Sequence, residues 1–422
     1  MIPNDESANV LSLRKPGEPA MTTLFVGNFE FEHRLASSSP RQLPHTVRRI
    51  NHELATLWVA IAEDGDFIWT PATVEQGFFE ELTSLGLPSV EPRNDGRCPA
   101  EPVEVCPWGW TDEIRKWADQ RNWKYVAPWQ PVVREINSRR FSVQLESEWG
   151  CGLAGQRVIE SVDELSATIR RMPTGSDRWV VKAEFGMSAR ERLLGLGTEL
   201  SPQAINWVRK RLEPDRVLFF EPWIPPTHEA GLQYTIPQSG SPVFEGLTPL
   251  LTDRVGRYRG SRFALNERSE RLWSIAVEVG TQVAQRVQQM GYFGPLGFDA
   301  ARYRDQQGQS RVRPLQDINA RYTMGRLSLG FRRVLNPGEI GTWLHVRWPA
   351  TDQDAARIWI QNIQRQFPNG VRIIRTSPFV VDGRPVRHGT LVLTARSTDD
   401  LGQAETQLLE MEAAITPDRD YF

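Results

Sequence analysis

Apolar and polar positions in the first third of the chain alternate between short strands and amphipathic helices. A β-branched and aromatic run at residues 22–31 predicts an opening strand, and residues 44–54 follow with helical spacing. The apolar run at residues 56–64 predicts a second strand. Residues 1–135 are therefore expected to form a small, open α/β domain.

A tryptophan-rich stretch covers residues 106–130. Within it, Thr111 is placed to cap a helix that carries acids in its first turn and ends near Asn122. Tryptophans at this density are suited to stacking on bases or sugars, but packing in the core and between domains is the favoured interpretation.

Helix and strand patterns are sharper between residues 136 and 335. Ser161 and Glu164 form a capping box, and Ser201 followed by Pro202 begins a second helix. The expected strands cover residues 178–185, 216–224, 232–237 and 242–251, and a long amphipathic helix covers residues 268–290. These elements predict a second, larger α+β domain.

Residues 336–422 show a different order of elements, in which a strand and a helix are followed by two strands and a last helix. This order predicts a compact α+β appendage.

Composition narrows the possible function by exclusion. The net charge is −2, which gives no reason to expect a nucleic-acid partner. We find no run of about 18 apolar residues that could cross a membrane, and the polar first 20 residues lack the apolar core of a signal peptide. Three cysteines are too few for a disulfide framework or a zinc site, and the six histidines lack metal-binding spacing. We therefore expect a cytoplasmic protein.

A predicted β-hairpin carries the most specific polar pattern. Two strand-like runs flank the turn-like sequence QQGQS, and a loop centred on Gly308 places Asp299 opposite Asp317. Like charges that face each other on a sheet need solvent or a bound cation. Asn319 adds another oxygen donor, and this donor set suits magnesium. A solvated hairpin with incidental acids is the alternative.

Lysine is rare in this chain, since only five of its 50 basic residues are lysines. Lys182 ends an apolar strand, which can aim its ammonium at a phosphate while the basic loop at residues 183–192 closes above it. A lysine that extends from a strand edge into solvent is the alternative. The next strand carries Glu221 and Trp223 at its end. The passage from this strand into the following loop can present backbone groups to an adenine ring.

Four arginines lie between residues 254 and 262. Two of them could bind phosphate or a substrate carboxylate, but a solvated basic loop is the favoured interpretation.

The order of these motifs resembles the ATP-grasp superfamily, of the carboxylate-amine ligase type. The resemblance covers residues 136–330 and includes a strand lysine, a basic loop, a hinge glutamate, a long helix and an acidic hairpin. Its most specific part is the sequence QDINAR at residues 316–321. The resemblance implies an ATP-grasp fold of mixed α/β and α+β class. Two α+β lobes would clasp ATP, preceded by an open α/β domain (1–135) and followed by a small α+β appendage (336–422).

The resemblance also implies roles for individual residues. The nucleotide would be bound from the small lobe and the hinge, by Arg139, Lys182, Glu221, Trp223 and either Glu229 or Gln233. Magnesium would be held by three hairpin residues, Asp299, Asp317 and Asn319. The outer phosphates and the substrate carboxylate would meet the catalytic side chains of Lys182, Arg321 and either Arg190 or Arg192.

Three positions depart from the family pattern. Asp317 stands where the family usually has glutamate. Arg139 replaces a second ATP-binding lysine, and arginine cannot copy lysine geometry. The link before Glu229 and Gln233 is longer than usual, so either residue could bind the ribose. These departures bear on affinity and not on fold.

The implied activity is an ATP-dependent ligation that forms an amide or peptide bond through an acyl phosphate. Small carboxylic acids and amines, amino acids among them, would be the substrates, with ATP and Mg²⁺ as cofactors and a homodimer as the assembly. Two other functions stay open at this point: a phosphotransferase of the same fold, and a nucleotide-binding protein with weak catalysis.

Overall fold

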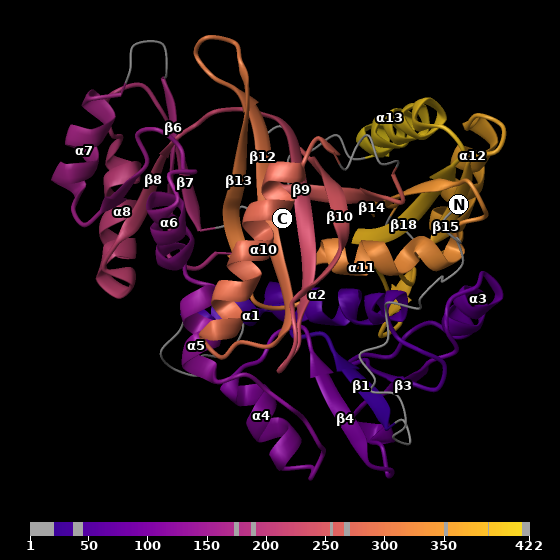
Figure 1. The fold of residues 1–422 in the computed structure, drawn as a ribbon. Helices are drawn as coiled ribbons and strands as arrows, with labels where there is room; N and C mark the ends of the chain where they lie inside the picture. The colour runs from indigo at the N-terminus through magenta and orange to yellow at the C-terminus, as the bar shows by residue number, and fades with distance from the viewer. Residues whose placement is uncertain are drawn as a thin grey trace, which may run out of the picture.

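The computed structural model describes residues 21–36, 45–172, 177–186, 191–253, 256–265, 271–349, 353–386 and 388–415. Figure 1 shows an N-terminal part at the bottom, a small lobe at the left, and a large sheet that runs through the centre to the right. Among the described helices, none combines the length and apolar character that a bilayer crossing requires.

The N-terminal part is an open sheet of four parallel strands in the order β3-β2-β1-β4. Its elements are β1 (Thr22–Val26), α1 (Phe31–Ala36), α2 (His45–Leu54), a 3₁₀ helix (Ala55–Ala60), β2 (Phe67–Trp69), α3 (Phe78–Ser84), β3 (Glu91–Arg93), a 3₁₀ turn (Asp95–Arg97), β4 (Val103–Pro107), α4 (Asp112–Asp119) and α5 (Gln130–Ile136). The Thr111 hydroxyl accepts a hydrogen bond of 3.3 Å from the Ile114 amide, so the predicted cap of α4 is confirmed.

The predicted strand at residues 56–64 is wrong. Residues Ala55–Ala60 continue from α2 as a 3₁₀ helix whose six residues are all buried. A short apolar run that is buried on every side fits a helix as well as a strand, and its periodicity cannot distinguish the two.

The small lobe is a four-stranded antiparallel sheet in the order β5-β8-β6-β7. Its elements are α6 (Arg139–Glu148), β5 (Arg157–Ile159), α7 (Val162–Arg170), β6 (Arg178–Lys182), β7 (Arg192–Leu196), α8 (Pro202–Asp215) and β8 (Leu218–Pro222). Ser161 and Ser201 cap α7 and α8 through side-chain bonds of 3.1 Å, as predicted. The sheet thereby holds Lys182 at the end of β6.

The large sheet has eight antiparallel strands in the order β13-β12-β9-β10-β11-β14-β18-β15. Its first part contains β9 (Pro226–Ile236), β10 (Val243–Thr252), β11 (Tyr258–Phe263), α10 (Ser274–Gln289), β12 (Gly294–Arg304), β13 (Ser310–Asn319), α11 (Met324–Gly330) and a 3₁₀ helix (Phe331–Val334). Its second part contains β14 (Ile340–Arg347), α12 (Gln353–Gln366), β15 (Arg372–Arg375), β16 (Val380–Val381), β17 (Arg384–Pro385), β18 (His388–Ala395) and α13 (Thr398–Ile415). Because β14 pairs with β11, the sheet continues across residue 335, where the sequence suggests a boundary.

The arginine-rich segment near residue 258 forms strand β11, so the favoured interpretation of a solvated basic loop is wrong. The Arg262 guanidinium donates to both oxygens of Glu405, and Arg259 forms an ion pair with Glu412. Both acids lie on α13, so the basic strand is neutralised by a helix far along the chain. Arg254 lies outside the described residues.

The long amphipathic helix predicted over residues 268–290 covers Ser274–Gln289 and buries fewer of its large apolar residues than an amphipathic spacing indicates. Val283 and Val287 are buried, but Leu272 and Ile275 are about half exposed. Small residues supply the rest of the buried face, including Ala276 and Gly280, and a Cβ atom added at Gly280 would lie 3.0 Å from the Tyr234 hydroxyl. A stripe counted from large apolar residues misses this close approach.

Candidate active site

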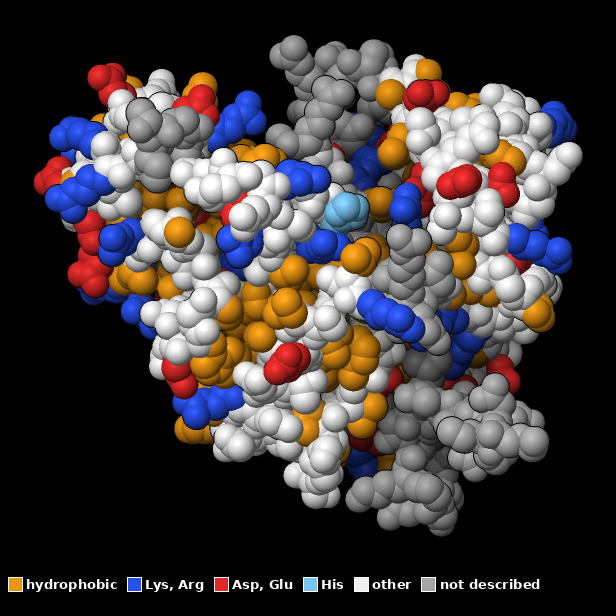
Figure 2. All heavy atoms as spheres, turned by 45° about the horizontal axis from the view of Figure 1, so that its top comes forward, with side chains coloured by type: hydrophobic (Ala, Val, Ile, Leu, Met, Phe, Trp, Pro, Cys, Tyr) orange, Lys and Arg blue, Asp and Glu red, His pale blue; other side chains and the backbone are white. Residues whose placement is uncertain are grey.

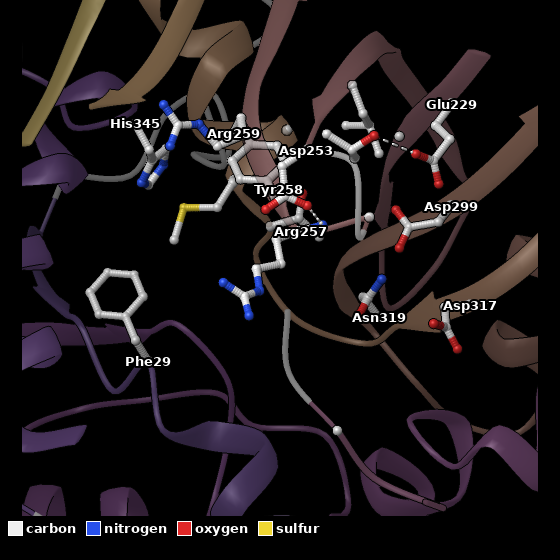
Figure 3. Close-up of a pocket in the computed structure, with 18 of the residues that line it drawn as sticks. Phe29, Glu229, Asp253, Arg257, Tyr258, Arg259, Asp299, Asp317, Asn319 and His345 are labelled. Atoms are coloured by element: carbon white, nitrogen blue, oxygen red, sulfur yellow. Dashed lines mark hydrogen bonds between the residues drawn. The ribbon is translucent and has the colours of Figure 1, made fainter. Parts of the chain in front are cut away.

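A cavity of about 350 Å³ lies where the three parts of the chain meet. It is lined by side chains of the N-terminal part, of the small lobe, and of strands from both halves of the large sheet. Figure 2 shows basic side chains and a histidine around the recess between the left-hand and right-hand parts of the molecule. The close-up in Figure 3 shows Glu229, Asp299, Asp317 and Asn319 together at one end of this cavity.

The two acids of the hairpin face each other as predicted. Strands β12 and β13 pair in a register that places Asp299 directly opposite Asp317. Burial and the neighbouring Asp317 carboxylate raise the pKa of Asp299 to about 7. Among the described side chains, the ion-pair partner of these two acids is Arg139, whose Nη2 donates a 3.3 Å hydrogen bond to Asp317 Oδ2. The pair is therefore short of positive charge.

Asn319 is the last residue of β13, and Arg321 follows it on the way to the N-terminal part. The Asn319 side chain hydrogen-bonds Asp299, and its Oδ1 accepts a hydrogen bond of 2.9 Å from Arg321 Nη2. Arg321 also forms an ion pair with Glu32 on α1, and its guanidinium lies 5.5 Å from the ring centroid of Trp108. The predicted carboxylate-facing arginine thus connects the hairpin to the N-terminal part.

Lys182 belongs to a buried chain of four charges, which we call the Lys182 network (Glu146, Lys182, Glu221 and Arg313). Lys182 Nζ lies 2.7 Å from Glu221 Oε2, and Arg313 Nη2 lies 2.9 Å from Glu221 Oε1. Arg313 also donates two bonds, of 2.6 and 2.9 Å, to Glu146. Burial opposes ionisation of Glu221, but Arg313 and Lys182 outweigh it and hold its pKa well below the usual range.

Helix α6 connects this network to the hairpin acids. Arg139 begins the helix and contacts Asp317, whereas Glu146, two turns later, binds Arg313 on the same strand, β13. Arg139 and Glu146 are seven positions apart on the helix, a rise of about 10 Å, and their partners Asp317 and Arg313 are four positions apart on the strand, about 13 Å. The two distances nearly match. The helix therefore lies along β13 and fixes both charged groups against the small lobe.

Two predicted nucleotide ligands differ in their surroundings. Glu229 lines the cavity and accepts a hydrogen bond of 2.9 Å from Thr252, and burial raises its pKa. Gln233 also lines the cavity, but its side-chain oxygen accepts a 2.6 Å bond from Thr323 and its side chain is buried.

The predicted hinge residues lie apart from the cavity wall. Neither Glu221 nor Trp223 is among the described residues that line the cavity. The Glu221 carboxylate is occupied by the Lys182 network, and the Trp223 amide donates to the Arg178 carbonyl at 2.9 Å. Arg192 lies opposite Lys182 in the pairing of β6 with β7, whereas Arg190 lies outside the described residues.

Several residues that line the cavity have no local sequence motif. From the N-terminal part they include Phe29, Glu32 and Trp108. From β11, β14, β18 and α13 they include Tyr258, Arg259, His345, His388 and Glu412. Burial lowers the pKa of His345 and of His388 to about 3, with nearby arginines as the second cause, so both imidazoles are neutral at pH 7. Two of these residues lie in segments that the sequence analysis singled out: Arg259 in the arginine-rich segment and Trp108 in the tryptophan-rich stretch.

Comparison with known proteins gives a fold but no sequence relative. No protein-family model matches the sequence, and no curated protein matches it. Solved structures do match along nearly the whole chain. One is a carboxyaminoimidazole ribonucleotide synthase from Aspergillus clavatus complexed with ATP, at 12% identity and a TM-score of 0.53, covering 94% of this chain and 99% of the other.

Two biotin carboxylases match as well. The enzyme from Campylobacter jejuni, in a β,γ-ATP complex, is 11% identical with a TM-score of 0.51, covering 96% of this chain and 92% of the other. A biotin carboxylase domain dimer of the Hydrogenobacter thermophilus 2-oxoglutarate carboxylase, solved with MgADP, ADP and bicarbonate, is 9% identical with a TM-score of 0.51. That match covers 93% of this chain and 90% of the other.

The chain has the ATP-grasp fold. The fold predicted from the order of the motifs is therefore confirmed, with the small sheet and the large sheet as the two lobes of the grasp. The C-terminal elements of this ATP-grasp chain are joined to the large lobe by continuous strand pairing.

The two hairpin acids suit a divalent metal ion. Asp299 and Asp317 supply two facing carboxylates, and burial together with the charge of Asp317 raises the pKa of Asp299 to about 7, a cost that a divalent cation would offset. Asn319 could join them only if its amide rotated, because its oxygen accepts from Arg321. Within the described part of the chain, no group of three or more His, Cys, Asp or Glu side chains is arranged to hold a metal ion.

Proposed function

We propose that this protein is an ATP-dependent ligase that joins a carboxylate carbon to an amine nitrogen through an acyl phosphate. The observation that carries the proposal is the pair of under-neutralised carboxylates, Asp299 and Asp317, which line the same cavity as Lys182 and Arg321. The ATP-grasp fold supports it, because the matching structures were solved with ATP, an ATP complex or MgADP.

We assign the nucleotide's phosphate end to the cavity wall around Lys182. Lys182 and Arg139 would bind phosphate oxygens, with Arg192 opposite Lys182 and Arg190 retained as a prediction. Asp299 and Asp317 would hold Mg²⁺, with Asn319 after its amide rotates. The ion would neutralise negative charge on the outer phosphates.

For the ribose we favour Glu229 over Gln233. Glu229 lines the cavity with one bond from Thr252, whereas the amide of Gln233 is buried and engaged by Thr323. Adenine recognition would use backbone groups beside Glu221 and Trp223, because the Glu221 carboxylate is already paired with Lys182.

The reaction divides into two displacements. In the first, an oxygen of the acid substrate bonds to the terminal phosphorus of ATP, and the bond to the ADP oxygen breaks. In the second, the amine nitrogen bonds to the acyl carbon, phosphate leaves with the electrons of the broken carbon–oxygen bond, and the nitrogen loses a proton. Arg321 would stabilise the negative oxygen atoms in both steps. Exclusion of water from the cavity would protect the acyl phosphate.

The substrates in this proposal are a small carboxylic acid and a small amine, with amino acids included. We also propose a cytoplasmic homodimer without a nucleic-acid partner. The three cysteines are free, as expected in a reducing compartment, and one matching structure is a dimer.

ADP release from Mg²⁺-ATP in the presence of pooled carboxylic acids, with and without pooled amines, tests the activity. Amine-dependent release, with a condensed product found by mass spectrometry, is the expected result. Amine-independent phosphorylation would instead identify a phosphotransferase, and nucleotide binding without turnover would identify a nucleotide-binding protein. We expect Asp317→Asn to lower turnover by a factor on the order of 10² or more.

The matched control for that variant is Asp305→Asn. Asp305 is an acid at the tip of the same hairpin, bound to Arg311, and it does not line the cavity. Equal loss of turnover in both variants would show that the effect comes from the hairpin fold and not from the metal site.

A further inference from the structure

The wall that the N-terminal part contributes to the cavity differs in chemistry from the rest. Six of its described residues line the cavity: Phe29, Glu32, Ile50, Glu53, Leu54 and Trp108. Four are apolar, two are acids, and within the described residues no Lys or Arg joins them. In Figure 3, Phe29 extends into the cavity from this side, facing Arg257 and Tyr258 on the other. The N-terminal wall thus contributes acids without bases, whereas the rest of the described lining carries acids and bases together.

Glu32 is the residue of this wall whose surroundings indicate that a ligand binds here. Its side chain is buried, with the whole residue 7% exposed. Oε1 accepts from Arg321, but Oε2 is buried and has no hydrogen-bond partner among the described residues. A buried carboxylate oxygen without a donor is unfavourable, because its hydration is lost without compensation. A ligand with a hydrogen-bond donor would remove this cost.

The chemistry around Glu32 limits what that donor can be. An anionic group is disfavoured, because a carboxylate oxygen such as Glu32 Oε2 repels negative charge and has no hydrogen to donate. A metal ion would need several oxygen or nitrogen donors, and the described residues offer no such cluster here. An ammonium group satisfies both conditions, since it is cationic, small and carries three donors.

The apolar residues of the wall indicate that the rest of the ligand is apolar. Phe29 and Trp108 pack with ring centroids 4.8 Å apart, and both are almost fully buried. Ile50 and Leu54, on successive turns of α2, are only partly buried and continue the apolar surface. An apolar substituent placed beside them would lose water without leaving a polar group unpaired.

We infer that the N-terminal wall is the subsite for the amine substrate, and that it takes a primary amine with an apolar or aromatic substituent, bound through its ammonium to Glu32. The inference rests on the proposed ligase function and names the substrate class for its second step. Glu32 Oε2 takes one proton from the bound ammonium, which gives the neutral amine. The nitrogen then attacks the acyl carbon beside Arg321, phosphate leaves with the bond electrons, and the second proton passes from nitrogen to phosphate.

Calorimetric titration tests this without knowledge of the acid substrate. The full chain is titrated with 2-phenylethylamine, 3-phenylpropionate and ethylamine, each with and without Mg²⁺ and a non-hydrolysable ATP analogue. We expect 2-phenylethylamine to bind at least tenfold more tightly than 3-phenylpropionate, which exchanges the ammonium for a carboxylate, and more tightly than ethylamine. We expect Glu32→Gln to weaken amine binding at least tenfold while the dissociation constant of the nucleotide analogue changes less than twofold.

Two further variants separate binding from folding. Glu32→Asp keeps the charge and should retain part of the affinity, whereas Glu63→Gln, which alters an N-terminal acid bound to Arg333 outside the cavity, should leave it unchanged. Equal amine affinity in wild type and Glu32→Gln, or tighter binding of the carboxylate probe, would overturn the inference. A wild-type protein that binds the nucleotide analogue but no amine would refute the inference alone, whereas failure to bind the nucleotide would refute the proposed function.

Discussion

The Lys182 network and the hairpin acids are two charged clusters near the two ends of helix α6, and their charges are balanced differently. In the Lys182 network, two acids and two bases alternate at distances between 2.6 and 2.9 Å. The hairpin acids, Asp299 and Asp317, face each other with one guanidinium at 3.3 Å from Asp317. The first cluster is complete without a ligand, and the second is not. A complete buried network holds a geometry, whereas an incomplete one indicates where a cation binds.

The largest expected effect comes from breaking the complete cluster. Arg313→Met leaves Glu146 and Glu221 buried with only Lys182 as a basic partner. We expect a loss of about 3–5 kcal/mol in the free energy of unfolding, because an uncompensated buried charge remains. Urea unfolding, followed by circular dichroism, measures it. Arg311→Met, on the same strand but exposed, should give no measurable change, and a similar loss in both variants would contradict the comparison.

A smaller effect is expected from pH at the incomplete cluster. The pKa of Asp299 rises from its ordinary 3.8 to about 7 in the folded protein, so between these values the folded state binds a proton that the unfolded state has lost. The contribution of Asp299 to stability therefore falls as the pH rises from about 4 to about 7, by at most about 4 kcal/mol.

Urea unfolding at a series of pH values, with EDTA present, measures this slope. We expect Asp299→Asn to remove that part of the slope, and Mg²⁺ to flatten it in the wild type by favouring the ionised pair. An identical pH dependence in wild type and Asp299→Asn would show that the two carboxylates do not interact as the register indicates.

The smallest expected effect concerns the ligand and not the fold. In Lys182→Met, Glu221 keeps its bond to Arg313, so the remaining network is still partly neutralised. We expect nucleotide affinity to fall about tenfold, equivalent to about 1.4 kcal/mol, because one charged contact to phosphate is lost. Titration with a fluorescent ATP analogue measures it, with Lys210→Met on the exposed face of α8 as the control. Unchanged affinity would remove Lys182 from the nucleotide site.

The sequence predicted those parts of the site whose partners are close along the chain. The sequence indicated that Asp299 and Asp317 face each other across one hairpin, but the turn alone does not fix that register. Near the turn the pairing of Ala301 with Arg313 is centred on residue 307, and an irregularity between Asp299 and Ala301 shifts the register so that Asp299 lies opposite Asp317. Caps at Thr111, Ser161 and Ser201 could be predicted because each acts within three residues.

Contacts over long sequence separations could not be predicted in this way. Glu32 and Arg321 are 289 residues apart, and Arg259 and Glu412 are 153 apart. No local periodicity records either pair. Strand β11 looked like a solvated loop because its arginines are polar in sequence, and only the acids of α13 make their burial favourable.

The continuity of the large sheet has a practical consequence for dividing the protein. Residues Gly260–Phe263 of β11 exchange ladder bonds with residues Gly341–Leu344 of β14. A polypeptide cut at residue 335 would expose these backbone groups along an unprotected edge, with the buried ring of Phe263 beside it. Such an edge pairs readily with other chains, so the shortened protein would self-associate and precipitate rather than remain a minimal catalytic fragment.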